Sequence, residues 1–164
     1  MNKTQFYAEL NRDFQSLMAG ETSFLATLAN TSALLFERLD GVNWAGFYLL
    51  EDKTLVLGPF QGKIACVRIP YGRGVCGTAV ATGEVQRVDD VHAFDGHIAC
   101  DASSNAEIVL PLRANGQVFG VLDIDSTVFN RFDADDEQGL RTLVEQLEAV
   151  IAGTDFKKFF APVA

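Results

Sequence analysis

The chain has 164 residues, of which 48% are hydrophobic and 21% are charged, and its formal net charge is −9. A chain of this length can bury roughly 70% of its unfolded surface in one domain, so it needs no disulfide to fold. The acidic balance argues against a surface that follows nucleic-acid phosphates. We therefore expect a single domain over residues 1–164 that binds a small molecule and no nucleic acid.

The N-terminal stretch, MNKTQFYAELNRDF, is polar and lacks the apolar run of a signal peptide. No window has the length and hydrophobicity of a membrane span. We therefore expect a cytoplasmic protein with no membrane contact. Disulfides are seldom structural in that compartment, so its cysteines favour catalysis, redox sensing or metal binding.

Apolar residues at helical spacing predict helices at both ends of the chain. Two helices are predicted over about residues 3–40. The first is capped by Thr4 and ends at Gly20, and the second begins near Thr22 and stops before Gly41. The segment FDADDEQGLRTLVEQLEAVIAG predicts a third helix over about 133–152. Its first turn is acidic, which complements the helix dipole.

Strand patterns fill the region between these helices, about residues 42–126. VNWAGFYLLEDKTLVLGPF predicts a hairpin, KIACVRIP a third strand that carries Cys66, and VQRVDDV, residues 85–91, a short strand. EIVLPLRANGQVFGVLDIDS predicts a hairpin that turns at Asn115-Gly116. Strands joined as hairpins and flanked by helices predict an α+β fold with a central, mostly antiparallel six-stranded sheet.

Gly72, Gly74 and Gly77 have the spacing G-x-G-x-x-G of dinucleotide-binding turns. That motif requires a parallel strand in a βαβ unit and an acidic ribose partner about twenty residues later. Here the surrounding strands are hairpins, and Asp90 and Asp95 fall in a polar loop. We expect a turn into a short helix over residues 75–81, and no nucleotide cofactor.

Three cysteines, Cys66, Cys76 and Cys100, lie within 35 residues. Cys100 belongs to a long polar stretch, residues 92–105, and loops of that length are more often functional than idle. The commonest alternative for a cytosolic cysteine is a buried, inert thiol. Asp101 would raise the pKa of Cys100 and a protonated His97 would lower it, so the sequence does not decide its reactivity.

Zinc is another interpretation of three cysteines with His92 and His97. Structural zinc sites usually present ligands as close pairs, whereas these cysteines are ten and twenty-four positions apart. The two histidines are five positions apart in a loop, where we expect them to be solvated. The sequence therefore predicts no metal.

The succession PYGRGVCGTAVATGE, VDDV and VFGVLDIDS resembles a GAF domain over nearly the whole chain. More narrowly, GPFQGKIACVRIPYGRGVCGTAV, HIACDASSNAEIVLPL and GVLDIDS are similar to the free methionine-(R)-sulfoxide reductases. The resemblance implies an enzyme that reduces the R epimer of the free amino acid sulfoxide with thiols. It also implies a thioredoxin-type dithiol reductant and no organic cofactor.

The same resemblance implies roles for eight residues. Cys100 is similar to the nucleophile of these enzymes, Cys66 to the principal resolving cysteine, and Cys76 to a third cysteine of less settled role. The positions that match the substrate pocket are Trp44, Tyr48, Glu107, Asp123 and Asp125.

These residue types suit the chemistry. A cysteine that reduces a sulfoxide becomes a sulfenic acid, and a second cysteine condenses with it to a disulfide. Asp123 and Asp125 point to one face of their strand, where crowded carboxylates raise each other's pKa until one can donate a proton. The alternative is that both face solvent. Trp44 and Tyr48 share a strand face and could enclose an S-methyl group, although strand aromatics are more often core.

A bond between Cys66 and Cys100 would be favoured by roughly 4 kcal/mol in the chain-entropy description. Since it must be reducible, we expect the Cys100 loop to differ between the reduced and oxidised forms. The competing function is a non-catalytic GAF sensor that binds a small ligand and uses its cysteines as a redox switch. Sensors normally signal to an attached output domain, which we do not expect within 164 residues, so we favour the enzyme. The sequence does not decide between a monomer and a homodimer, or which acid donates the proton.

Overall fold

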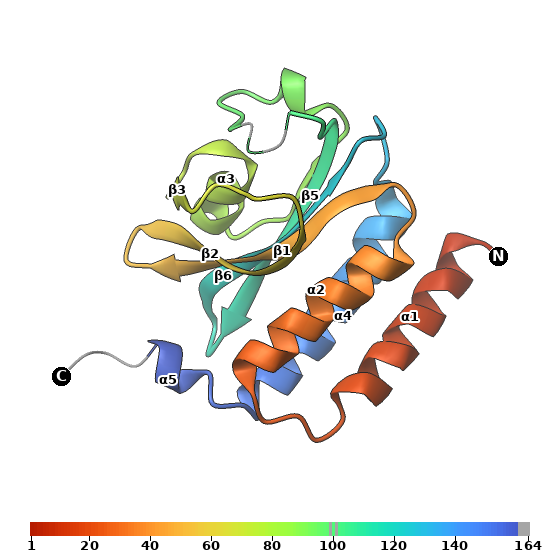
Figure 1. The fold of residues 1–164 in the computed structure, drawn as a ribbon, viewed down its shortest axis with the longest axis vertical. Helices are drawn as coiled ribbons and strands as arrows, with labels where there is room; N and C mark the ends of the chain where they lie inside the picture. The colour runs from red at the N-terminus through yellow and green to blue at the C-terminus, as the bar shows by residue number, and fades with distance from the viewer. Residues whose placement is uncertain (99, 101, 161–164) are drawn as a thin grey trace.

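The computed structural model describes residues 1–98, 100 and 102–160. The elements are α1 (Lys3–Met18), α2 (Phe24–Arg38), β1 (Val42–Glu51), β2 (Thr54–Gly62), β3 (Arg68–Pro70), α3 (Gly74–Thr82), β4 (Gln86–Val88), η1 (Val91–Ala93), β5 (Ala106–Ala114), β6 (Gln117–Ser126), α4 (Ala134–Ala152) and α5 (Lys157–Phe160). A six-stranded sheet divides the structure into two parts, with α1, α2 and α4 on one face and α3 with long loops on the other (Figure 1).

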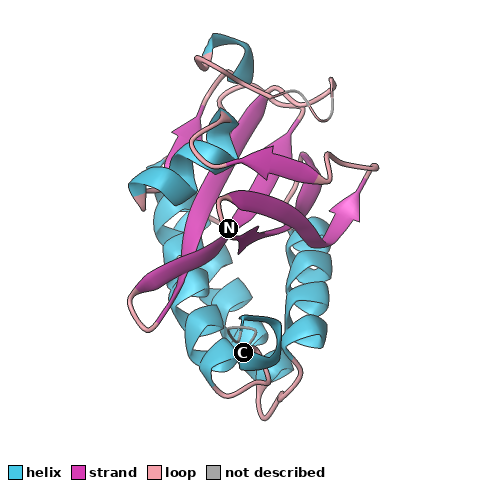
Figure 2. Cartoon of the chain, turned by 90° about the vertical axis from the view of Figure 1, so that its left-hand side faces the viewer, coloured by secondary structure: helices cyan, strands magenta, loops and turns pink. Residues whose placement is uncertain are grey.

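The strand order is β3-β2-β1-β6-β5-β4, and each neighbouring pair is antiparallel. The α+β fold predicted from the sequence is therefore confirmed. Helices α2 and α4 pack on the sheet, and α1 packs mainly on α4. Figure 2 shows the strands gathered at one end of the molecule and most of the helical layer at the other. None of the helices in the described chain is long and apolar enough to cross a membrane.

The predicted N-terminal helices are present, but their caps differ. Asn2, not Thr4, caps α1: its side chain accepts a hydrogen bond from the Gln5 backbone at 2.8 Å, and the Gln5 side chain accepts one from the Asn2 backbone. Ser23 caps α2 in the same way through the Ala26 backbone, so the helix begins two residues later than predicted. The C-terminal helix lies where it was expected.

The predicted strand KIACVRIP is wrong over most of its length. Strand β3 has only three residues and forms the sheet edge, and Cys66 lies in the loop before it. Side chains of β1 hold this loop instead of a strand ladder: Trp44 Nε1 donates to the Lys63 carbonyl at 3.2 Å, and Tyr48 Oη donates to the Cys66 carbonyl at 2.8 Å. Loop and pocket are thereby tied together.

Two short elements were not predicted. The strand expected over residues 85–91 ends at Val88, and Val91 opens the short helix η1, whose cap Asp90 accepts a hydrogen bond from the His92 backbone at 3.0 Å. The helix α5 follows α4, and its Phe160 packs on the hydrophobic core beside Phe119. Short elements such as these are fixed by tertiary contacts more than by local pattern.

The sheet separates two clusters of buried side chains. The larger cluster fills the space between the sheet and the helices, and includes Ala45 and Phe47 of β1. The alternate residues of the same strand, Trp44 and Tyr48, point to the other face, toward α3. This second face carries the candidate site, because it is only partly covered by α3 and the loops.

Gly46 lies between these two aromatic residues and makes room for Phe60 of β2. A Cβ atom at this position would come within 2.3 Å of the Phe60 Cβ. The close approach lets the Phe60 ring stack on Trp44, with centroids 5.2 Å apart. The glycine therefore shapes one wall of the site.

We expect Gly46→Ala to lower the free energy of unfolding by about 1–3 kcal/mol, because the added methyl group forces the two strands apart. Gly153→Ala is the matched control, since a Cβ there meets only the Val150 carbonyl at 3.5 Å. Urea unfolding followed by circular dichroism measures both. A Gly46→Ala protein as stable as the control would show that the contact is not needed.

Candidate functional site

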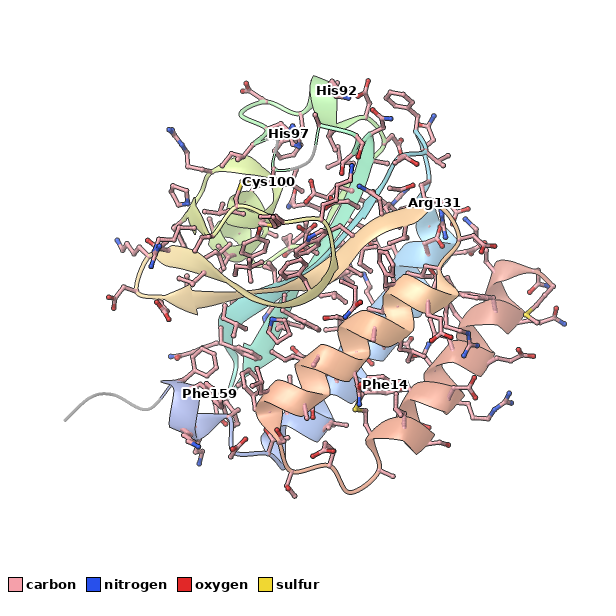
Figure 3. All side chains as sticks on the ribbon, viewed as in Figure 1. Phe14, His92, His97, Cys100, Arg131 and Phe159 are labelled. Carbon is pink, nitrogen blue, oxygen red and sulfur yellow. A yellow bond between two sulfur atoms is a disulfide. The ribbon has the colours of Figure 1, made fainter. Side chains whose placement is uncertain are left out.

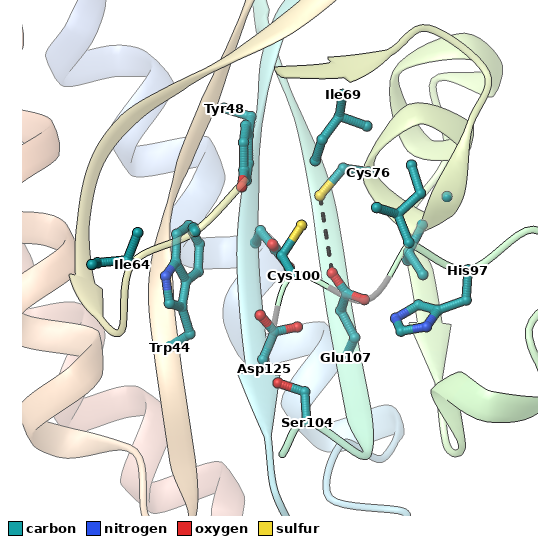
Figure 4. A pocket seen from close by; sticks show the side chains of 15 residues that line it. Trp44, Tyr48, Ile64, Ile69, Cys76, His97, Cys100, Ser104, Glu107 and Asp125 are labelled. Atoms are coloured by element: carbon teal, nitrogen blue, oxygen red, sulfur yellow. Dashed lines mark hydrogen bonds between the residues drawn. The ribbon is translucent and has the colours of Figure 1, made fainter. Parts of the chain in front are cut away.

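The site is a small cavity between the sheet, the start of α3 and the loop that carries Cys100 (Figure 4). Its volume is about 40 Å³, which is room for roughly three water molecules. A free amino acid is several times larger. We therefore expect the loop to be arranged differently in the form that binds such a ligand.

A disulfide between Cys66 and Cys100 closes this loop, with their Cα atoms 5.4 Å apart. Cys100 lines the cavity, whereas Cys66 is not among the lining residues. Cys100 lies between the β2–β3 loop and α3 in Figure 3. The structure thus joins the two cysteines for which the sequence suggested complementary roles. Asp101, which we expected to raise the pKa of Cys100, lies outside the described residues.

Three carboxyl groups line the cavity from the central strands. Glu107 of β5 pairs with Asp125 of β6, and Asp123 lies two residues earlier on the same face. Asp123 and Asp125 both line the cavity, so the prediction that they share a strand face is correct. Glu107 and Asp123 are only 6% and 5% exposed, so the alternative that both aspartates face solvent is wrong for Asp123. Buried acids on adjacent strands have little water to stabilise their charges.

Burial is the main cause that raises the pKa of Glu107 well above its usual value, and the charges of Asp123 and Asp125 raise it further. Burial also raises the pKa of Asp123, although hydrogen bonds from Glu107 and Cys76 act in the opposite direction. The pattern places a shared proton on Glu107 with Asp123 as its acceptor. The cluster can therefore both donate a proton and hold a negative charge.

Cys76 is the one free cysteine, and it is buried in α3. Its Sγ donates to Glu107 Oε2 at 3.9 Å, the dashed line in Figure 4. Burial raises the pKa of this thiol, and the nearby Asp123 and Glu107 raise it further. A thiol held protonated in this way is a poor nucleophile, which separates Cys76 from the other two cysteines.

Trp44 and Tyr48 form the opposite wall, with rings 5.9 Å apart and nearly parallel. Both are buried. Burial, with the charge of Asp123, raises the pKa of Tyr48, so its hydroxyl stays a neutral donor to the Cys66 carbonyl. The two aromatics therefore serve two purposes, as an apolar wall and as anchors of the Cys66 loop.

Several lining residues were not identified from the sequence. His97 was expected to be solvated, but it is half-buried beside the cavity, and burial lowers its pKa. A neutral His97 does not lower the pKa of Cys100 by its charge. Ser104, 6% exposed, accepts a hydrogen bond from Asn43 Nδ2 at 3.0 Å and anchors the end of the loop. Neither position belongs to a recognisable motif.

The histidine and cysteine set considered for zinc is not assembled in the described structure. Cys66 and Cys100 are bonded to each other, and His92 is exposed and bonds Asn105 at 2.9 Å. A different trio, Cys76, Glu107 and Asp123, has ligand atoms within 4.8 Å of one another and could hold a divalent cation.

The glycine motif, Gly72, Gly74 and Gly77, leads into α3 from the antiparallel edge strand β3. This arrangement does not fit the nucleotide-binding turn, which follows a parallel strand.

Comparison with known proteins adds to this geometry. The sequence profile of the GAF domain matches residues 22–152. A free methionine-R-sulfoxide reductase of Escherichia coli K12 is 79% identical over 164 residues, which cover 100% of this chain and 99% of that protein.

Two solved structures are also similar. One is free methionine-R-sulfoxide reductase from Neisseria meningitidis in complex with its substrate, with a TM-score of 0.90 and 45% identity over 93% of this chain and 92% of that one. The other is the fRMsr of Staphylococcus aureus in its reduced form, with a TM-score of 0.86 and 50% identity over 88% and 94% of the two chains.

The raised pKa of Glu107 predicts how the oxidised protein responds to pH. Above about pH 4.5, the usual value for this carboxyl, the unfolded chain loses a proton that the folded protein keeps. Stability from this group therefore falls as the pH rises, by at most about 1.4 kcal/mol per pH unit. We expect Glu107→Gln to gain stability relative to the wild type between pH 5 and the raised pKa.

Thermal and urea unfolding over that pH range measures the difference. Glu37→Gln, a change at an exposed position of α2, is the matched control. If the curves of Glu107→Gln and the wild type stay parallel from pH 5 upward, Glu107 does not hold the proton.

Proposed function

Since the chain belongs to the GAF-domain family and, within it, to the free methionine-(R)-sulfoxide reductases, we propose how its side chains carry out that reaction. The enzyme reduces free methionine (R)-sulfoxide to methionine. The observation that carries the assignment of roles is the disulfide between Cys66 and Cys100, formed at the mouth of a cavity lined by buried carboxyl groups.

Cys100 is the nucleophile in this proposal. Its thiolate attacks the sulfoxide sulfur, one proton is added, and the oxygen passes to the enzyme as a cysteine sulfenic acid while methionine leaves. Cys100 suits this role because it lines the cavity, whereas Cys66 does not. The high pKa of Cys76 argues against that residue as the attacking thiolate.

Glu107 is the proton donor that we propose for the sulfoxide oxygen. It is the carboxyl whose pKa is raised by burial and by both neighbouring aspartates. General acids with raised pKa values contribute typically 10²–10⁴-fold to rate. Once the proton has left, the thiol of Cys76, 3.9 Å away, is placed to stabilise the resulting carboxylate.

The substrate's ammonium group fits beside Asp123. The Oδ1 atom of Asp123 is buried and has no hydrogen-bond partner among the described residues. Buried acceptors are normally satisfied, and an ammonium group carries three donors that could satisfy this one. We propose that Asp123, with Asp125 beside it, recognises the free α-amino group, which a peptide-bound residue lacks.

The substrate's carboxylate fits the start of α3. Gly74, Val75 and Cys76 line the cavity, and no described side chain caps this helix at Arg73. The first backbone N–H groups of a helix, together with its dipole, attract anions. Trp44 and Tyr48 would then enclose the S-methyl group on the opposite wall.

Resolution uses Cys66. Its thiol attacks the sulfenic sulfur of Cys100, water leaves, and the disulfide of the present structure forms. The hydrogen bond from Tyr48 to the Cys66 carbonyl positions the loop for this step. We propose that a thioredoxin-type dithiol reduces this disulfide. We also propose that the enzyme works in the cytoplasm, where such dithiols are kept reduced.

The direct test is consumption of free methionine (R)-sulfoxide with dithiothreitol as reductant. We expect Cys100→Ser to lose at least about 100-fold in turnover, and to form no methionine in a single turnover. In a single-turnover experiment without dithiothreitol, the pre-reduced Cys66→Ser protein should still form one equivalent of methionine and then stall, because it lacks the resolving thiol.

The S epimer serves as the control substrate and should not be consumed by any form. If Cys100→Ser releases one equivalent of methionine while Cys66→Ser releases none, the two roles are reversed. Undiminished turnover by both variants would exclude the mechanism.

A further inference from the structure

The surface around Cys66 differs from the rest of the molecule. Residues 53–83 contain four basic residues and no aspartate or glutamate, in a chain with a net charge of −9. The four are Lys53, Lys63, Arg68 and Arg73, all exposed. Among the described residues, none of them forms an ion pair. Two of them, Lys63 and Arg68, lie three and two positions from Cys66.

The same surface exposes apolar side chains. Ile64 is 92% exposed and Val67 is 54% exposed, on either side of Cys66, and Tyr71 at the end of β3 is 43% exposed. Ile64 is the most exposed of the large apolar side chains in the described structure. Exposed apolar groups within a charged rim are typical of protein interaction sites.

Access distinguishes the two sulfur atoms of the disulfide. A thiolate must approach one sulfur from the side opposite the other, so the attacked sulfur needs open space beyond it. Cys100 faces a cavity of about 40 Å³, which cannot admit a loop of another protein. Cys66 is not among the residues that line that cavity; it is half-buried, and Ile64 and Val67 on either side of it are exposed.

We propose that a dithiol reductant protein with an acidic, apolar-rimmed active site docks on residues 63–68 and attacks the sulfur of Cys66. This inference rests on the proposed function and specifies the reductant's place in it. The exposed Ile64 and Val67 contact the apolar rim, and Lys63 and Arg68 pair with its acidic groups. Charge complementarity of this kind speeds association and is weakened by salt.

The electrons balance in two exchanges. The reductant's first thiolate bonds to Cys66 Sγ, the bond between Cys66 and Cys100 breaks, and Cys100 leaves as a thiolate into the cavity. The reductant's second thiol, after losing its proton, then attacks the mixed disulfide, so Cys66 is released as a thiol and the reductant becomes the disulfide. Cys100 is thus freed directly on the side where the next substrate binds.

The first experiment compares two reductants. Val67→Ser with Arg68→Glu should raise the KM for thioredoxin at least fivefold, with turnover by dithiothreitol within a factor of two of the wild type. Both residues lie outside the cavity lining, whereas Ile64 belongs to it and is left unchanged. The matched control is Val128→Ser with Arg12→Glu, which alters a valine 49% exposed and an exposed arginine of α1.

Each outcome is decisive. Loss with thioredoxin alone supports the proposal, and high salt should raise the wild-type KM for thioredoxin but not that for dithiothreitol. Equal loss with both reductants, or no loss with either, overturns it. A change from dimer to monomer on sedimentation, with thioredoxin turnover retained, would assign the surface to a second copy. Absence of turnover by the wild type with dithiothreitol would instead refute the proposed function.

The second experiment identifies the attacked sulfur. A thioredoxin whose second active-site cysteine is replaced by serine traps the mixed disulfide with the oxidised enzyme, and N-ethylmaleimide stops further exchange. Trypsin places each cysteine in its own peptide, namely residues 64–68, 74–87 and 88–113. Attachment to the peptide 64–68 is the expected result. Attachment to 88–113 would show that Cys100 is attacked and would overturn the proposal.

Discussion

The site depends on the burial of acidic groups that cannot all be charged. Glu107, Asp123 and Asp125 project from two adjacent central strands into a cavity that is also lined by the start of α3 and by Cys100. With little water present, the three carboxyl groups are most stable when one of them keeps its proton. Burial and the charges of both neighbouring aspartates raise the pKa of Glu107, which favours that residue as the protonated one. The same burial keeps Cys76 a thiol. The proposed roles in acid catalysis and ammonium binding both rest on this one electrostatic constraint.

The second constraint is the bond between Cys66 and Cys100 beside the cavity. The oxidised form leaves a volume of about 40 Å³, so we expect the substrate to bind the reduced form. Trp44 and Tyr48 couple the two halves of the cycle, because the rings line the cavity while their polar atoms hold the backbone of the Cys66 loop. In the proposed mechanism, substrate binding and disulfide formation therefore share the same two side chains.

Much of this architecture could be predicted from the sequence. The alternation along VNWAGFYLLE and VFGVLDIDS placed Trp44 with Tyr48, and Asp123 with Asp125, on shared faces, and apolar residues at helical spacing predicted the helices at both ends of the chain. The predictions that failed concern short segments. The strand predicted through Cys66 was wrong because hydrogen bonds from the Trp44 and Tyr48 side chains hold residues 63–66. His97 and Ser104 were missed because only tertiary folding brings their loop to the cavity.

The central claim is that Glu107 keeps its proton above the usual pKa of a glutamate, and infrared difference spectroscopy of the carboxyl groups tests it directly. We predict that the carbonyl band of a protonated carboxyl persists in the wild type as the pH is raised above 4.5, the usual value for this group, and that Glu107→Gln lacks this band. A wild type with every carboxyl ionised, or a band that is unchanged in the variant, would contradict the account.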